Sequence, residues 1–251
     1  MARQRGVIKL EGTIDDLTFY KTKDGYMAKE NPKLSADRIA TDPAFVRTRE
    51  NGAEFGRAGK ATTLLHTAFR AQLLSVKDQR MYSRLLKQMM KVIKADTTSI
   101  RGMRNVLDGD VELLQGFDFN DNNRLASTLY APYEATINRA TGQFTTSLAA
   151  FVPAQMILAP SGATHFRINA LAAEIDFVNG SYTADNKATA TLPLDNVLTA
   201  AISLESTLTP GSTHPLFLAV GIEFLQSVNG EFYQLKNGGY NALGLVKVEG
   251  A

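Results

Sequence analysis

The sequence has no cysteine and only three histidines among its 251 residues. Without cysteine there is no disulfide framework, no thiolate metal ligand and no cysteine nucleophile. Three scattered histidines, with no cysteine to complement them, argue against a zinc site built by the protein. We therefore expect this chain to bind neither a metal nor a cofactor.

Long apolar runs are also missing. No stretch of 18 apolar residues occurs in the sequence, so we expect no membrane-spanning helix. The opening residues, MARQRGVIKLEG, are basic and lack an apolar stretch of signal-peptide length. These two absences predict a cytoplasmic protein, or a particle component that assembles in the cytoplasm.

The motifs of catalytic and ion-binding sites are lacking as well. His66, His165 and His214 have no Glu or His at metal-ligand spacing, and Ser161 lies outside a G-x-S-x-G elbow. The stretch 118–124 has neither the glycine nor the closing glutamate of an EF-hand loop. We interpret these residues as packing and turn residues, predict no catalytic residue, and expect that the chain is not an enzyme.

Charge is divided along the chain, although the net charge is only +2. Residues 1–105 carry 21 Lys and Arg against 11 Asp and Glu, and residues 106–251 carry 6 against 14. A basic half can bind nucleic acid. A basic half and an acidic half can also attract each other between copies of one chain, because complementary fields steer association.

The basic part, residues 1–107, is predicted to contain a small β-meander followed by helices. Turn residues at 15–16 and 23–25 separate strand-like runs, which lie at residues 7–10, 17–20 and 26–28. A meander of this size buries little and must pack on something else.

Helices are expected after a connector over residues 31–41. Asp42 and Pro43 are typical of a helix start. Helical patterning extends to residue 75, either as one helix or as two helices separated near Gly59. A second helix follows Asp78, and a short helical piece is expected over residues 98–106.

The acidic part, residues 108–251, changes to strand patterning. Turn signals such as Asn179-Gly180 and Asn229-Gly230 separate strand-like runs at roughly ten-residue spacing. The clearest of these runs are 133–137, 144–148, 165–177, 216–226, 231–235 and 240–248. We predict an α+β protein of two domains, 1–107 and 108–251, the second an antiparallel β-sandwich of immunoglobulin-like or jelly-roll type.

The stretch TRENGAEFGRAGKATTLL places Gly52, Gly56 and Gly59 on one face of a predicted helix. It is not a Walker phosphate loop, because Glu54 stands at the first glycine position and Ala61 follows the lysine. Each glycine costs up to about 1 kcal/mol in a helix relative to alanine. Close approach of another backbone would offset that cost, and the partner is either the sandwich of the same chain or a neighbouring subunit.

Four cations surround this glycine face: Arg47, Arg49, Arg57 and Lys60. Arginine binds carboxylates bidentately, so these residues are candidates for contact with the acidic half of a neighbour. The same cations can hold phosphates. We take the three glycines and four cations together as a candidate subunit interface.

Two stretches resemble a group of uncharacterised proteins from Bacteroidota-type bacteria. They are GVIKLEGTIDDLTFYKTKDGYMAKE with DPAFVRTRENGAEFGRAGKATTLL, near the start, and PLFLAVGIEFLQSVNGEFYQLKNGGYNALGLVKV at the end. The resemblance implies a recurring two-part design, with a basic head and a β tail. It implies no activity and no site residues.

The hypothesis that the sequence favours is a non-enzymatic structural protein that assembles with itself into a filament, tube, sheath or shell, as in a phage-like particle. Its subunits would be joined by contact of the basic head with the acidic β tail, and by addition of the meander at residues 7–30 to another sheet. The first alternative is a nucleic-acid-binding protein that uses the basic half. Lysines beside Phe19, Tyr20 and Tyr26 would suit such binding, because bases stack on aromatic rings. A third reading is a carbohydrate- or protein-binding sandwich module.

Overall fold

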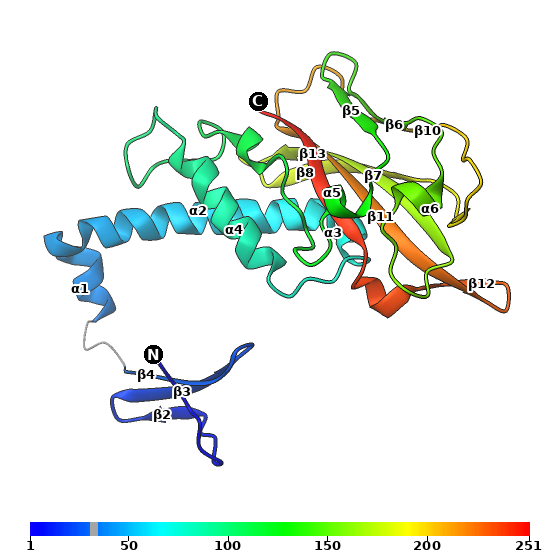
Figure 1. Ribbon diagram of the computed structural model, residues 1–251. Coiled ribbons are helices and arrows are strands. Elements are labelled where there is room, and N and C mark those ends of the chain that lie inside the picture. The colour runs from blue at the N-terminus through cyan, green and yellow to red at the C-terminus, as the bar shows by residue number, and fades with distance from the viewer. Residues whose placement is uncertain (31–34) are drawn as a thin grey trace. The chain divides into compact units, whose positions relative to one another are not determined.

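A computed structural model describes residues 1–30 and 35–251, without the side chains of residues 236 and 237. The chain forms two compact units, Met1–Arg49 and Glu50–Ala251 (Figure 1). Helices and antiparallel strands occur in both, which confirms the α+β class. The boundary between the units lies between residues 49 and 50 of the chain, so the boundary expected at residue 107 falls inside the second unit.

The first unit opens with a four-stranded antiparallel sheet in the order β1-β4-β3-β2. Its strands are β1 (Ala2–Arg3), β2 (Gly12–Ile14), β3 (Leu17–Thr22) and β4 (Gly25–Glu30). The predicted turns are present, because Asp15 has φ 50° between β2 and β3, and Gly25 has φ 113° at the start of β4. The predicted β3–β4 hairpin is thereby confirmed.

The strand predicted at residues 7–10 does not form, and we call residues 5–11 the N-terminal loop. Gln4 closes this loop: its side chain donates to the Leu10 carbonyl at 3.2 Å and accepts from the Leu10 N–H at 2.9 Å. Lys9 donates to the carbonyls of Gln4 and Gly6, each at 2.7 Å. Side-chain bonds to the backbone therefore replace the strand ladder that the apolar pattern favours.

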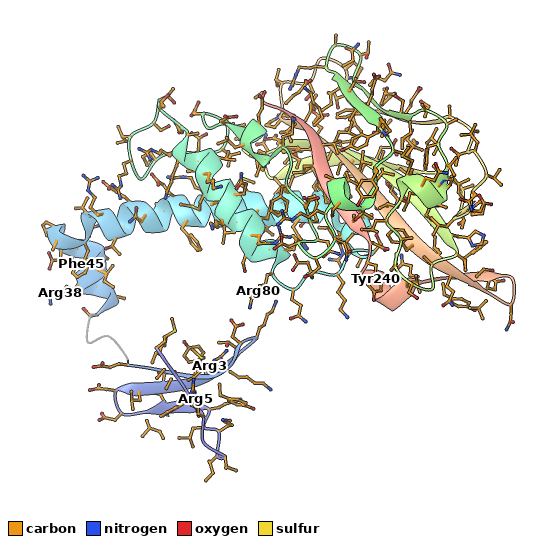
Figure 2. All side chains as sticks on the ribbon, in the orientation of Figure 1. Arg3, Arg5, Arg38, Phe45, Arg80 and Tyr240 are labelled. Carbon is orange, nitrogen blue, oxygen red and sulfur yellow. The ribbon has the colours of Figure 1, made fainter. Side chains whose placement is uncertain are left out.

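Part of the predicted connector is helical. Residues 31–34 of that connector lie outside the described residues, but α1 (Ala36–Thr41) follows, with the Ser35 side chain accepting from the Arg38 N–H. Asp42 then caps the 3-10 turn η1 (Pro43–Phe45), as its sequence predicts. The Arg38 guanidinium lies 6.0 Å from the centre of the Phe45 ring, and both side chains are labelled in Figure 2.

The glycine-rich stretch is one continuous helix. α2 (Val46–Ala68) runs through Gly59 without a break, so the break left open there is absent. The helix ends before residue 75, because Phe69 leaves helical geometry and α3 (Arg70–Leu73) follows. The second predicted helix is α4 (Met81–Lys94).

The helical piece expected over residues 98–106 is wrong. The buried Asp96 carboxylate accepts from the backbone N–H groups of Thr98, Ser99 and Asn105, at 2.9, 2.8 and 3.1 Å. These bonds bend the chain around Asp96 and take up donors that a helix would use. Gly102 adds a φ of 87°, which is incompatible with a right-handed helix.

The second unit contains two antiparallel sheets. The smaller has the order β10-β6-β5, with β5 (Tyr133–Asn138), β6 (Gln143–Leu148) and β10 (Ile202–Thr207). The larger is centred on β7 (His165–Asp176) and β11 (Leu216–Val228), which pair along ten residues. Its outer strands are β8 (Ser181–Ala188) and β9 (Leu192–Pro193) beside β7, and β12 (Glu231–Gln234) and β13 (Ala242–Glu249) beside β11.

Short helical turns complete the second unit. They are η2 (Val111–Leu114), α5 (Leu125–Thr128), α6 (Pro153–Met156) and η3 (Leu235–Gly238).

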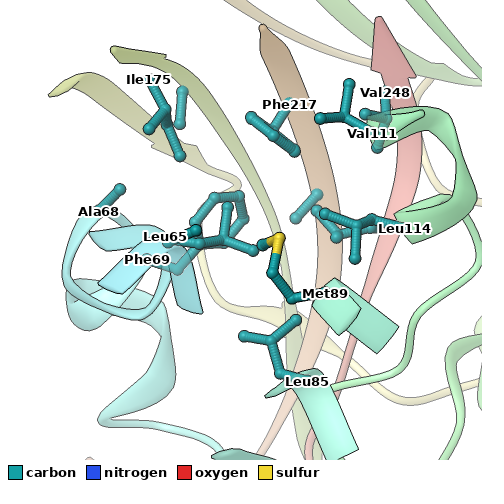
Figure 3. Close-up of a cluster of buried hydrophobic side chains, with 14 of the residues drawn as sticks. Leu65, Ala68, Phe69, Leu85, Met89, Val111, Leu114, Ile175, Phe217 and Val248 are labelled. Carbon is teal, nitrogen blue, oxygen red and sulfur yellow. The ribbon is translucent and has the colours of Figure 1, made fainter. Parts of the chain in front are cut away.

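The large sheet has a hydrophobic core on each face. On one face, Leu65, Phe69, Leu85 and Met89 from the helical segment pack against β7, β11 and β13 (Figure 3). On the other face, side chains of β5, β6 and β10 pack against alternate residues of the same strands. The helices after Arg49 therefore share a core with the strands, which is why they belong to one compact unit.

Candidate interaction site

The three histidines lie apart and each has a structural partner. His66 lies 6.1 Å from the Tyr82 ring, and His165 lies 4.7 Å from the Phe232 ring. His214 lies between Glu174 and Asp176. Within residues 1–30 and 35–251, no group of three His, Cys, Asp or Glu side chains has a geometry that could hold a metal ion.

The His214 cluster is polar, and the sequence analysis did not anticipate it. Glu174, Asp176 and Ser212 are buried, whereas the His214 side chain is 40% exposed. Ser212 Oγ donates to Glu174 Oε1 at 2.6 Å, and His214 Nδ1 lies 3.0 Å from the same oxygen. His214 Nε2 lies 3.6 Å from Asp176 Oδ2. Ser212 Oγ bonds to a carboxylate and not to the imidazole, so the cluster does not contain the Ser–His pair of a catalytic triad. The alternation of Glu174 and Asp176 on one face of β7 was the signal available in the sequence.

The carboxyl groups of this cluster titrate below their usual range. Burial acts to raise the pKa of Glu174, but hydrogen bonds from Ser212, Thr209 and His214 outweigh it and lower that pKa. The pKa of Asp176 is lowered chiefly by hydrogen bonds from the backbone and side chain of Asn179. The cluster therefore joins the 209–214 loop to β7 by bonds to ionised carboxylates.

The glycine face of α2 is open. Apart from the adjoining turns of the helix itself, no atom of the described chain lies within 4 Å of the place where a Cβ would stand on Gly52, Gly56 or Gly59. The helix instead buries its opposite face, through Ala58, Leu65 and neighbours, in the core. Of the two partners left open by the sequence, the sandwich of the same chain does not cover these glycines.

The four predicted interface cations differ in their surroundings. Arg49 donates to the carbonyls of Ile39 and Asp42, at 2.8 and 3.0 Å. Arg57 donates to the Gly102 carbonyl at 2.6 Å and also reaches that of Arg104 at 3.2 Å. Both guanidinium groups therefore bind backbone carbonyls of their own chain.

Arg47 and Lys60 are exposed on α2. Within the described part of the chain, Lys60 has no hydrogen-bond or ion-pair partner.

A groove of about 1080 Å³ lies beside the glycine face, and we call it the α2 groove. Its walls come from α2, from Tyr82 of α4, from residues 105–108, and from residues 177–182 at the turn between β7 and β8. Its lining includes Gly56, Gly59, Lys60, Leu107, Val178 and Tyr182. These segments lie far apart in the sequence and are brought together within the second unit.

The walls of the α2 groove are held by local bonds. The Asp176 carboxylate accepts from the N–H groups of Val178 and Asn179, at 2.9 and 3.0 Å, and fixes the predicted Asn179-Gly180 turn. Asn105 Oδ1 accepts from the N–H groups of Leu107 and Asp108, at 2.9 and 3.0 Å. The groove is therefore preformed, and Val178, which is 72% exposed, lines it.

The first unit has no buried side chain among its described residues. The register of its sheet places Ile14 beside Leu17, Phe19 beside Ala28, and Tyr26 beside Lys21, so the apolar side chains among them share one face. Ile14 and Leu17 are exposed on that face. Phe19, Tyr26 and Ala28 are half-buried, and no described residue of the first unit covers Ile14 and Leu17.

The basic residues of α4 form an exposed row. Lys87, Lys91 and Lys94 lie on one face of the helix and are exposed, whereas Arg84 pairs with Asp78 at 2.7 Å. None of the three lysines has an ion-pair partner in residues 1–30 and 35–251. We call these three residues the α4 lysine row.

Across the described ranges, none of the helices combines the length and apolar character needed to cross a membrane. No protein-family model, curated protein or solved structure matches the chain. The geometry of the molecule is therefore the basis for the functional proposal.

Proposed function

We propose that this chain is a non-enzymatic structural protein whose copies assemble into a homopolymer, such as a filament, tube, sheath or shell. The observation that carries the proposal is that no described side chain of the Met1–Arg49 unit is buried. A small sheet is stable when its hydrophobic face packs against another element. Fully burying one side chain such as Leu17 or Ile14 contributes about 1.5–3 kcal/mol, and a neighbouring copy supplies the surface for it.

The open glycine face of α2 supports the same function. Three glycines in one helix cost roughly 0.5–1 kcal/mol each relative to alanine, and no contact in the described chain offsets that cost. A helix flank bare of side chains lets a second backbone approach closely. An interface between copies would therefore explain why Gly52, Gly56 and Gly59 occupy these positions.

We also propose that the second unit is a β-sandwich, of immunoglobulin-like or jelly-roll type, that serves as the rigid body of each subunit. The core between the two sheets, which includes Phe144, Leu204 and Phe224, supports this arrangement. In such a design the sandwich holds the α2 groove in place and the first unit makes contacts with the next copy.

A pair of charge substitutions on the small sheet tests the assembly. We expect electron micrographs and light scattering of the natural chain to show polymers. Leu17→Lys puts a charge on the apolar face and should abolish them. Thr18→Lys, one residue along on the opposite face, is the matched control and should leave them intact.

Two results would overturn the proposal. One is a monodisperse monomer at high protein concentration in both low and high salt. The other is equal assembly of the two lysine variants, provided that circular dichroism shows both to be folded.

The α4 lysine row supports a second candidate, a nucleic-acid-binding protein. Three exposed lysines on one helix face can contact successive phosphates. Such contacts release counterions, so the logarithm of the binding constant falls with the logarithm of the salt concentration, with a slope of about −0.7 to −0.9 per phosphate contacted. Filter binding across a salt series measures that slope. Substituting Lys87, Lys91 and Lys94 by Gln should make the slope less steep. Failure of the natural chain to retain nucleic acid at low salt would exclude this candidate.

A further inference from the structure

We infer that the α2 groove receives the N-terminal loop of another copy of this chain. This inference rests on the proposed self-assembly and assigns the two surfaces that meet. The loop is the donor surface on one copy, and the groove is the acceptor surface on the next.

The donor surface is apolar, exposed and outside any strand. Val7 is 102% exposed and Ile8 is 80% exposed, and Leu10 is exposed as well. Among the described residues, Val7 is the most exposed of the large apolar side chains. Three such side chains within four residues form a site for a partner rather than isolated surface residues.

The loop can also become extended. The order Val-Ile-Lys-Leu has the β-branched and apolar residues that favour strands. In the protomer, bonds from the side chains of Gln4 and Lys9 hold it as a loop. Exchange of these few exposed bonds for contacts with a neighbour would let residues 6–11 lie flat in a groove.

The acceptor surface has the size and composition for such a segment. Its volume of about 1080 Å³ lies just above the roughly 300–1,000 Å³ of small-ligand sites. Gly56 and Gly59 leave bare backbone on one wall, while Leu107, Val178 and Tyr182 offer apolar surface on the others. Tyr182 belongs to β8, the outermost strand of its sheet, and the edge of a sheet accepts extended segments.

The charges at the two surfaces complement each other. Lys60 is exposed at the groove and Glu11 is exposed at the end of the loop. In the part of the chain that the structure describes, neither has an ion-pair partner. With Ile8 and Leu10 in the groove of the next copy, the adjacent Glu11 is available to pair with Lys60 in its lining.

A second copy is the occupant that fits the rest of the molecule. Each copy carries one loop and one groove, and these are different surfaces. A contact between them is therefore heterologous, so it repeats from copy to copy and forms a ring or an open helical polymer. That is the kind of assembly that the proposed function requires.

Single cysteines test the contact directly, because the natural chain contains none. We expect that a mixture of Val7→Cys and Val178→Cys chains, when oxidised, forms a disulfide between two chains. Mass spectrometry of the digested product identifies peptides joined from residue 7 to residue 178. Leu74→Cys is the matched control, because Leu74 is 75% exposed and is not part of the groove; its yield with Val7→Cys should stay at the background of random collision.

Two results of the cysteine experiment would overturn the inference. One is a yield with Val178→Cys that equals the yield with Leu74→Cys. The other is a double Val7→Cys, Val178→Cys chain that closes its disulfide within one chain at high dilution and forms none between chains, which would show that the groove holds its own loop. If polymers are present in micrographs while the cross-link is absent, this inference fails and the proposed function stands.

An assembly measurement gives an independent readout. Ile8→Asp should raise the protein concentration at which polymers appear by about tenfold or more, equivalent to about 1.4 kcal/mol. Leu74→Asp changes an equally exposed apolar residue outside the groove and should leave that concentration unchanged. Equal concentrations for the two variants would contradict the inference.

Discussion

The buried carboxylate of Glu54 accepts a hydrogen bond from the backbone N–H of Gly102, 2.9 Å away. Glu54 is 2% exposed and stands at the position where a Walker loop would require glycine. Its carboxylate therefore joins α2 to the loop after α4, and the conformation of that loop depends on it.

Removing this carboxylate should destabilise the second unit. Glu54→Ala leaves the Gly102 N–H buried without a partner, which costs about 1–3 kcal/mol. Glu54→Gln retains an oxygen acceptor and should cost less. Urea denaturation followed by circular dichroism measures both, and equal losses for Ala and Gln would show that the hydrogen bond is not the cause.

Alanine at the open glycines should act in opposite directions on the protomer and on its assembly. The added methyl groups of Gly56→Ala and Gly59→Ala meet no atom within 4 Å beyond the adjoining turns of α2, so each substitution should stabilise α2 by roughly 0.5–1 kcal/mol. The added methyl groups should nevertheless weaken polymer formation if a backbone packs there. Melting temperatures of dilute protein and light scattering of concentrated protein separate the two effects.

Gly102→Ala is the control for this pair. Gly102 has φ 87°, and an added Cβ would lie 2.9 Å from Glu50, so this substitution should destabilise the protomer. Improved polymer formation by Gly56→Ala or Gly59→Ala would contradict an interface at the glycine face.

Acid should weaken the second unit through the His214 cluster. The folded protein lowers the pKa of Glu174 below its ordinary 4.5 and that of Asp176 below 3.8. A lowered carboxyl pKa stabilises the fold fully above the ordinary value, and this stability is lost as pH falls through the folded value. We therefore expect the free energy of unfolding to be steady from pH 7 to about 5 and to fall below about pH 4.5.

Glu174→Gln isolates the contribution of one carboxyl group. This variant cannot ionise at residue 174, so its free energy of unfolding should decline less steeply with acid than that of the natural chain. Urea denaturation at a series of pH values between 3 and 7 gives the comparison. Identical slopes in the acid range would rule out Glu174 as a source of the pH dependence.

The shared core predicts that helices and sheets of the second unit unfold together. Leu85 on α4 is fully buried against the sheet, and Leu85→Ala should cost about 2–5 kcal/mol. The loss should appear in one cooperative transition that includes residues 50–251, observed by hydrogen exchange. Separate transitions for residues 50–107 and 108–251 would instead support a division at residue 107.

The hairpins of the second unit were predicted from the sequence because they depend on local turn residues. Gly142 and the Asn179-Gly180 and Asn229-Gly230 pairs sit at turns with positive φ, at Gly142, Gly180, Asn229 and Gly230. These residues fix hairpins between neighbouring strands, so the antiparallel pairs β5–β6, β7–β8 and β11–β12 follow from short-range patterns. The helix start at Asp42-Pro43 was likewise predicted from a local pattern, because Asp42 accepts a hydrogen bond from the N–H of Ala44, two residues on.

Side-chain bonds to the backbone, and packing between segments far apart in the sequence, explain the features that the sequence analysis did not predict. Gln4 and Asp96 each bind backbone groups several residues away, and those bonds convert an expected strand and an expected helix into loops. The α2 groove combines residues near 60, 107 and 180 of the sequence. Such a site depends on the packing of α2 beside the β7–β8 turn, which no local pattern reports.

Successive side chains of β11 alternate between the two hydrophobic cores, and this restricts where insertions and deletions can occur during evolution. Phe217 and Ala219 enter the core under the helices, while Leu218, Val220 and Ile222 enter the core between the sheets. Deleting one residue inside β11 would send each following side chain to the opposite core. Insertions and deletions among natural variants should therefore be tolerated at the Asn229-Gly230 hairpin tip and be eliminated by selection within β11.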